Sequence, residues 1–186
     1  MCTNRSKKIS KVVEECECIF EIMKSETACF TGHRSQKLPW KFNENDERCV
    51  AMRNKAKGLI EKAINIGYKN FISGMALGFD TICAELVLEL KEKYPHIRLV
   101  CAIPCKTQSA PWHENQKIRY QSILKQADLI RYISNEYTEN CMLERNEYMI
   151  NNSSLVIALY NGKGGGTGYT VRRAKERNLE LLIIEP

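Results

Sequence analysis

Two glycine-rich turns decide the fold: Ser73-Gly74-Met75-Ala76-Leu77-Gly78-Phe79-Asp80 and Asn161-Gly162-Lys163-Gly164-Gly165-Gly166-Thr167-Gly168. Each directly follows a short apolar run, at residues 70–72 and 155–160. This order is typical of a buried strand that leads through a loop into a helix. Glycine permits positive φ and close approach to a ligand, and the free N–H groups at a helix start favour an anion, usually a phosphate. Two such turns therefore indicate a nucleotide-like ligand.

From Thr27 onward, the rest of the chain alternates apolar runs with amphipathic segments. We expect strands at 27–31, 71–72, 98–103, 129–134, 155–160 and 181–184. We expect helices at 45–66, 80–93, 112–126, 140–150 and 167–177. This alternation predicts an α/β fold with a mostly parallel sheet and helices on both of its faces. The strands are nearly continuous apolar runs, as burial on both faces requires.

The first 26 residues differ from the rest. Apolar residues at 12, 16, 19, 20 and 23 have helical spacing and follow a basic stretch that holds Lys7, Lys8 and Lys11. We therefore expect a helical extension at 1–26 ahead of a single domain at 27–186. The extension could dock on that domain, pair with another chain or bind a partner, and its pattern does not choose among these roles.

Composition sets the broad class. The chain has 186 residues, which suits one domain, and no apolar stretch approaches the roughly 20 residues needed to cross a bilayer. No signal peptide is visible, so we expect a cytoplasmic protein without a membrane partner. The nine cysteines lack paired C-x-x-C spacing, which favours free thiols over a metal site, and we expect no metal. The net charge of +6 allows an anionic ligand or nucleic acid without requiring either.

The turn at 73–80 argues against two common nucleotide-binding classes. It lacks the GxGxxG fingerprint of dinucleotide-binding enzymes, and no Lys-Ser/Thr pair follows it as in a P-loop. Asp80 is also a plausible helix N-cap, so it could be structural while the glycines contact the ligand. For the turn at 161–168, a plain flexible loop is the alternative to a phosphate cradle.

Gly32, His33 and Arg34 follow the first expected strand directly. Ligands of open α/β sheets bind at the carboxyl ends of strands, so these residues and both turns should converge on one crevice. Arg34 suits phosphate binding, although a capping or surface role is open to it. Arg145 could face the crevice or form a surface ion pair with a neighbouring glutamate. Trp112 could stack on a base, or act as a lid or core plug.

Four motifs in order resemble the SLOG superfamily, the Rossmann-like group that contains DprA and the LOG proteins. They are Gly32-His33-Arg34, the turn at 73–80, Met142-Leu143-Glu144-Arg145-Asn146-Glu147-Tyr148-Met149 and Gly164-Gly165-Gly166-Thr167. The Thr31–Arg34 start with Leu38-Pro39-Trp40 is most similar to the YpsA-type branch. The resemblance covers about 27–186. It implies a Rossmann-like three-layer sandwich, a crevice for nucleotides or ADP-ribose-like derivatives, and a homodimer paired through helices beside the crevice.

The same resemblance bears on catalysis. LOG enzymes cleave an N-glycosidic bond with an arginine and a glutamate; Arg145 occupies the arginine position, but Thr170 occupies the glutamate position. Threonine cannot act as a carboxylate base, and Glu85 or Glu144 could replace it only by reaching the crevice. We therefore expect a nucleotide-binding module, a regulatory sensor without efficient catalysis. The alternatives are a LOG-type phosphoribohydrolase with Arg145 and Glu85 as catalytic candidates, and a DprA-like protein that binds single-stranded DNA.

These observations yield one set of expected site residues and no certain cofactor beyond the nucleotide-derived ligand. The ligand-binding residues are expected to be Gly32, His33, Arg34, Ser73, Gly74, Met75, Ala76, Gly78, Asp80, Arg145, Gly164, Gly165, Gly166 and Thr167. Trp112 is the expected base-stacking residue.

Overall fold

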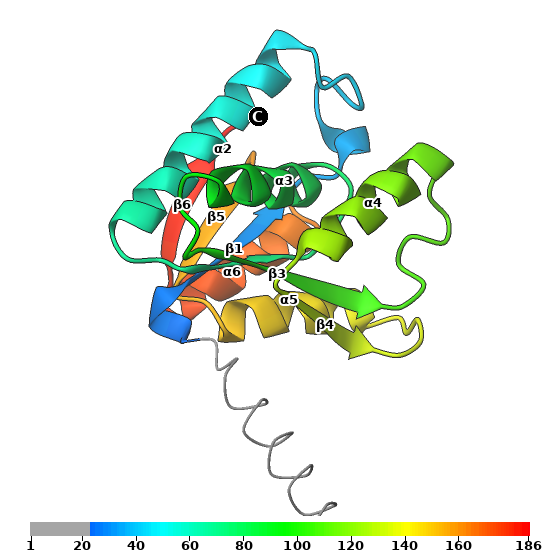
Figure 1. Ribbon diagram of the computed structural model, residues 1–186. Helices are drawn as coiled ribbons and strands as arrows, with labels where there is room; N and C mark the ends of the chain where they lie inside the picture. Colours follow the sequence, from blue (N-terminus) through cyan, green and yellow to red (C-terminus); the bar gives the residue numbers. More distant parts are fainter. Residues whose placement is uncertain (1–22) are drawn as a thin grey trace, which may run out of the picture.

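The computed structural model describes residues 23–186, which form one parallel sheet with helices on both sides (Figure 1). The strand order across the sheet is β4-β3-β2-β1-β5-β6, and every neighbouring pair is parallel. The strands are β1 (Thr27–Gly32), β2 (Asn70–Ser73), β3 (Arg98–Cys105), β4 (Leu129–Ser134), β5 (Leu155–Leu159) and β6 (Glu180–Ile184). The predicted α/β class is therefore confirmed, with a sheet that is wholly rather than mostly parallel.

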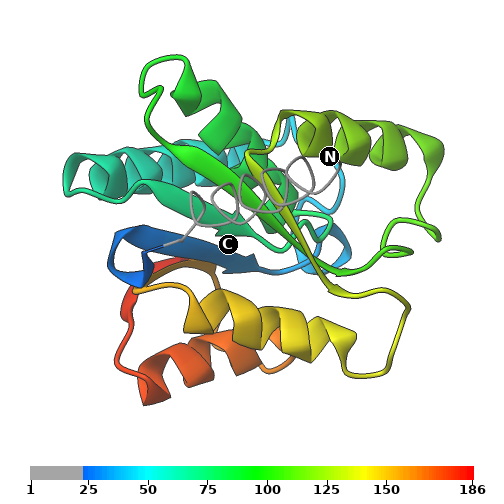
Figure 2. The ribbon, with the colours of Figure 1, turned by 60° about the horizontal axis from the view of Figure 1, so that its bottom comes forward.

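The helices form two outer layers, one on each face of the sheet (Figure 2). One face is covered by α2 (Glu47–Asn65), α3 (Phe79–Lys91) and α4 (Glu114–Gln126). The other is covered by α5 (Cys141–Asn151) and α6 (Gly166–Glu176). Each layer encloses its own apolar cluster, the larger around Phe30 and Phe71 and the smaller around Ile72 and Met149. This arrangement is the three-layer sandwich that the alternating pattern predicts.

The strand order reverses between β1 and β5. The chain proceeds outward from β1 through β2 and β3 to β4, and then returns through α5 to place β5 on the other side of β1. Ala28 to Gly32 of β1 pair in register with Leu155 to Leu159 of β5, so both strands end side by side. A crevice at such a reversal is the usual ligand site of open parallel sheets.

The structure extends β3 beyond its expected end. The sequence pattern predicts a strand at 98–103, but β3 continues through Pro104 to Cys105. The last β2 partner is Ser73, opposite Cys101, so beyond that point β3 pairs only with β4. A proline at such a one-sided position gives up no ladder hydrogen bond on the open side, and the strand tolerates it.

The N-terminal extension lies mostly outside the described residues. Of the segment 1–26, the structure describes residues 23–26, where a 3₁₀ turn, Lys24–Glu26, leads into β1. These residues are bonded to the domain: Lys69 Nζ lies 2.9 Å from Glu26 Oε1, and Ser154 Oγ donates to the Ser25 carbonyl. Within the described part of the chain, no helix is long and apolar enough to span a bilayer.

Candidate functional site

A pocket of about 240 Å³ opens at the carboxyl ends of β1 and β5, where the strand order reverses. Its lining includes these residues of the predicted set: Gly32, His33, Arg34, Ala76, Asp80, Arg145, Gly164, Gly165, Gly166 and Thr167. We call it the first pocket. The structure thus brings together the end of β1, the start of α3, the first half of α5 and the second glycine turn.

The second glycine turn presents open backbone to this pocket. A Cβ added to Gly164 would meet no atom within 4 Å, and one on Gly166 would only touch Asn146. Gly165 is the N-cap of α6 and has φ 105°, a conformation that L side chains rarely adopt. The first N–H groups of α6 have no partner within the helix, and the helix dipole adds positive potential there. The turn therefore offers an anion both donors and space.

His33 ties this turn to the end of β1. Its Nε2 lies 2.8 Å from Asn161 Oδ1, which also accepts a hydrogen bond from the Lys163 backbone amide. The imidazole is nearly buried and packs at a tilt against the ring of Tyr160. His33 thus lines the pocket and also holds the glycine turn in place, a role that the sequence pattern did not indicate.

Arg145 lies buried beside the first pocket instead of on the surface of α5. Its Nη1 donates to the Gly74 carbonyl and lies 3.8 Å from Asp80 Oδ2, and its Nε donates to Asn146 Oδ1 at 2.9 Å. The Arg145 and Asp80 side chains are each 7% exposed. A Cβ on Gly74 would overlap the guanidinium, so this glycine makes room for Arg145. The alternative of a surface ion pair with Glu144 or Glu147 is therefore wrong.

Burial dominates the ionisation of this pair. Desolvation raises the pKa of Asp80 to about 6, although Arg145, a backbone hydrogen bond from Ala76 and the charge of Arg34 all oppose it. Desolvation also lowers the pKa of Arg145, and Asp80 opposes that change. Asp80 is the one carboxyl group that lines the first pocket among the residues described, and its burial there accounts for the raised pKa.

The first glycine turn is mainly a framework. Of its expected ligand-binding residues, Ser73, Gly74, Met75 and Gly78 do not line the pocket. Ser73 Oγ donates to the Asp80 carbonyl and accepts from the Met75 amide. Gly78 forms a bridge with Arg34, and a Cβ there would lie 2.8 Å from the Ser35 nitrogen. These residues allow the backbone segments behind the pocket to pack closely. Glycine serves that purpose as well as it serves the close approach of a ligand.

Close packing also explains Gly32. This residue lines the pocket, yet a Cβ there would overlap the side chain of Phe79 at the start of α3. A larger residue would push α3 away from β1. Gly32 is thus required for the approach of helix to strand, whatever else it contacts.

Two exposed cations stand at the mouth of the pocket. Arg34 and Lys37 both line it, and neither forms an ion pair with any residue from 23 to 186. Lys37 Nζ lies 3.9 Å from the position that a Cβ on Gly165 would take, so it stands over the second glycine turn. Sequence reasoning missed Lys37, because its position depends on the 3₁₀ turn Ser35–Lys37.

The sequence also missed four other lining residues: Phe30, Thr31, Met142 and Asn146. Met142 precedes Arg145 by three residues on α5, and helical spacing could have placed it on the same face. Asn146 contacts Arg145 directly, which only the fold reveals.

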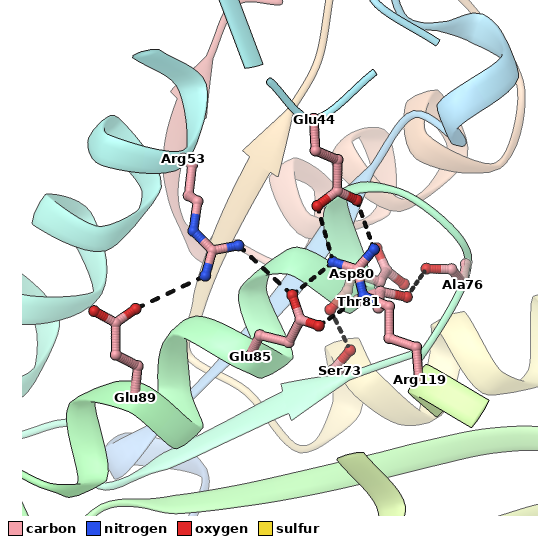
Figure 3. A network of polar contacts seen from close by, with 9 residues as sticks. All are labelled: Glu44, Arg53, Ser73, Ala76, Asp80, Thr81, Glu85, Glu89 and Arg119. Atoms are coloured by element: carbon pink, nitrogen blue, oxygen red, sulfur yellow. Dashed lines mark hydrogen bonds and ion pairs between the residues drawn. The ribbon is translucent and has the colours of Figure 1, made fainter. Parts of the chain in front are cut away.

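The alternative carboxylates do not reach the pocket. Glu85 points from α3 toward Arg119, with two contacts of 2.6 Å, and lies 3.6 Å from Arg53 (Figure 3). Glu144 is exposed on α5 and is absent from the lining. Thr170 is buried, and its hydroxyl donates to the Gly166 carbonyl at 2.9 Å. As arranged, neither Glu85, Glu144 nor Thr170 can serve as an acid or base in the first pocket.

A second pocket, of about 740 Å³, adjoins the first. The two share Arg34, Ala76 and Met142 in their linings. Trp112 and Phe42 belong to the wall of the second pocket only. Trp112, the expected base-stacking residue, thus lies beside the first pocket and not in it.

Comparison with known proteins assigns the family. The family described as the YspA SLOG family (YpsA) matches residues 28–182. The chain belongs to this family. The SPbeta prophage-derived protein YoqJ of Bacillus subtilis is 34% identical over 152 residues, covering 74% of this chain and 89% of that protein. A UPF0398 protein of Halalkalibacterium halodurans is 29% identical over 163 residues, covering 84% and 86%.

Solved structures of DprA share the fold of this SLOG-family chain. DNA processing protein A of Streptococcus pneumoniae superposes with a TM-score of 0.61 at 14% identity, over 87% of this chain. The Helicobacter pylori protein, whose structure is described for its single-stranded DNA binding mode, gives 0.59 at 20% identity, over 86%. The chain spans about half of the former protein and 65% of the latter. At these identities the likeness concerns the fold alone.

Proposed function

We propose that this SLOG-family chain binds the phosphate of a nucleotide or nucleotide derivative in the first pocket. One observation carries the proposal: the unobstructed glycine backbone at the start of α6 and two exposed cations, Arg34 and Lys37, line the same pocket. Neither cation has an ion-pair partner among the described residues. A phosphate there would accept hydrogen bonds from backbone N–H groups while the cations offset its charge.

The proposed role is that of a sensor without efficient catalysis. Glycosidic cleavage of the LOG type needs a carboxylate that is free to act. Among the described residues, Asp80 alone brings a carboxyl group to the lining of either pocket, and it is engaged with Arg145. A cytoplasmic location belongs to the same proposal and is supported by six buried, unpaired cysteines of residues 23–186. A homodimer stays a prediction.

The test is a binding measurement with Gly164→Asp as the informative variant. At Gly164 a side chain meets open space and φ is not positive, so the fold should survive, while a carboxylate in the pocket repels phosphate. We expect ribose 5-phosphate and nucleoside monophosphates to bind the wild type in calorimetry and to lose at least tenfold in affinity with the variant. Equal affinities, with both proteins equally stable, would refute the proposal.

Binding of single-stranded DNA is the second candidate function. It is favoured by the fold shared with DprA, described in H. pylori as binding single-stranded DNA, and the net charge of +6 is compatible with it. An oligonucleotide that contacts several cations should lose affinity steeply as salt increases, whereas a mononucleotide should show a shallow dependence. Binding of a labelled oligonucleotide and of a mononucleotide, each measured at salt concentrations from about 50 to about 200 mM, distinguishes the two candidate functions.

A further inference from the structure

The second pocket adjoins the first. Arg34, Ala76 and Met142 line both, so the two pockets meet at these three residues. The first pocket is small and carries the cations and the glycine backbone. The second is about three times larger, and its lining combines the apolar side chains of Phe42, Leu77 and Trp112 with polar ones such as Gln36, Asn115 and Gln116. This division suits a ligand with a compact anionic end and a larger, flatter end.

Two aromatic side chains line the larger pocket from separate segments. Trp112 precedes α4 and packs edge-on against Tyr120, with ring centroids 5.3 Å apart and an interplanar angle of 82°. This contact fixes the plane of the indole. Phe42 lies on the loop before α2 and is 53% exposed. Partly exposed rings on a concave surface are the usual platform on which nucleobases stack.

An ion-pair network holds these two segments together (Figure 3). Arg119 of α4 contacts Glu44, two residues after Phe42, at 2.6 and 3.1 Å, and contacts Glu85 of α3 at 2.6 Å through two nitrogens. Arg119 therefore ties the Phe42 loop to the helix that follows Trp112. Arg53 extends the network from Glu85 to Glu89, so α2 is joined to it as well.

Gln108 completes the link between the pockets. Its buried side chain lines the second pocket and donates through Nε2 to the carbonyls of Gly74 and Met75, at 3.3 and 3.0 Å. The same Gly74 carbonyl accepts from Arg145 of the first pocket. Gln108 Oε1 has no partner in the described part of the chain, so this wall carries an unsatisfied acceptor.

We propose that the second pocket holds the nucleobase of the ligand whose phosphate occupies the first pocket, stacked on Trp112. This inference rests on the proposed function. Arg119 is then a positioning residue, because it holds the Phe42 loop and α4 in register without lining the second pocket itself. The ligand is a single nucleotide unit that spans both pockets, with Arg34 at their junction.

The decisive experiment separates the two ends of the ligand. Ribose 5-phosphate probes the first pocket alone, and AMP, GMP, CMP and UMP add a base. We expect at least one of the four to bind the wild type about tenfold more tightly than ribose 5-phosphate, and Trp112→Ala to remove that gain while leaving ribose 5-phosphate affinity within about twofold. Arg119→Leu should weaken only the base-bearing probes, and Arg119→Lys should restore part of the loss.

Fluorescence gives a readout that a merely structural role would not change. The chain has two tryptophans, and Trp40 is buried at 5% exposure, so Trp40→Phe leaves Trp112 as the single indole. The binding mononucleotide should quench Trp112 emission, and ribose 5-phosphate should not.

Three outcomes would overturn the inference. If ribose 5-phosphate binds but no base adds affinity, the first pocket stands and the base subsite is refuted. If no probe binds, the proposed function itself fails. If Trp112→Ala weakens a labelled oligonucleotide and no mononucleotide, the occupant is a strand and not a single unit.

Discussion

Arg145 Nη1 lies 3.8 Å from Asp80 Oδ2 beside the first pocket, and each of the two side chains is only 7% exposed. The pair joins the first turn of α3 to the middle of α5, so helices from opposite faces of the sheet meet beside the first pocket. Breaking a buried pair from one side leaves an uncompensated charge, which costs far more than losing a surface pair.

Replacing Arg145 by methionine should therefore be strongly destabilising. The change leaves the buried Asp80 without its counter-ion and removes one of the two donors to the Gly74 carbonyl, the other being Gln108 Nε2, and we expect a loss of about 3–5 kcal/mol in the free energy of unfolding. Urea denaturation at pH 7 measures it. Arg172→Ala, which removes an exposed pair with Glu176, is the control and should cost less than about 1 kcal/mol. Similar losses for both variants would contradict this account.

Stability should depend on pH through Asp80. Its pKa in the folded state is about 6, above the ordinary value of 3.8, so the folded protein holds this proton more tightly than the unfolded chain. The contribution is therefore fully present below about pH 4 and is lost as the pH rises through 6. A difference of about 2 pKa units corresponds to roughly 3 kcal/mol.

Asp80→Asn isolates that dependence, because the amide does not titrate. The free energy of unfolding of the wild type should fall relative to that of the variant between pH 4 and 7, and the other titrating groups largely cancel in the comparison. Denaturation curves at each pH unit provide the measurement. Parallel pH profiles for the two proteins would show that Asp80 has an ordinary pKa.

Two glycine substitutions should distinguish a glycine needed for packing from one that faces open space. Gly74→Ala places a methyl group on the Arg145 guanidinium and should destabilise the fold by about 1–3 kcal/mol, the usual cost of overpacking a core. Gly164→Ala meets open space and should leave the melting temperature within about 2 °C. Thermal unfolding of both variants tests this, and a stable Gly74→Ala protein would be inconsistent with the buried position of Arg145.

Loss of the His33 side chain should loosen the second glycine turn. His33→Ala removes the bond to Asn161 Oδ1, so amide hydrogen exchange across residues 161–168 should accelerate, with a modest loss of about 1 kcal/mol in stability. His96→Ala, an exposed position, is the matched control. If exchange in the turn is unchanged while the protein remains folded, His33 does not order it.

The central strands were predictable because burial on both faces of a sheet requires continuous apolar runs, as in β1 and β5. The predicted segment 129–134 coincides with β4, and every other predicted end coincides with the observed one or differs from it by one or two residues, as between the predicted 45–66 and α2. Those ends depend on caps that local pattern describes poorly. Asp46, for example, accepts a hydrogen bond from the Arg48 amide and starts α2 two residues later than hydrophobic spacing suggested.

The sequence by itself determined the α/β class, the two glycine turns and the end of β1 as the place where a site should form, since hydrophobic period and glycine content are local properties. Only the tertiary structure decided what each glycine does: Gly74 accommodates Arg145, whereas Gly164 faces open space. The same holds for Lys37 over the second turn and Glu85 facing away from the site. Contacts between distant segments depend on the order of the strands and on the rotation of each helix about its axis. The hydrophobic spacing within one segment specifies neither.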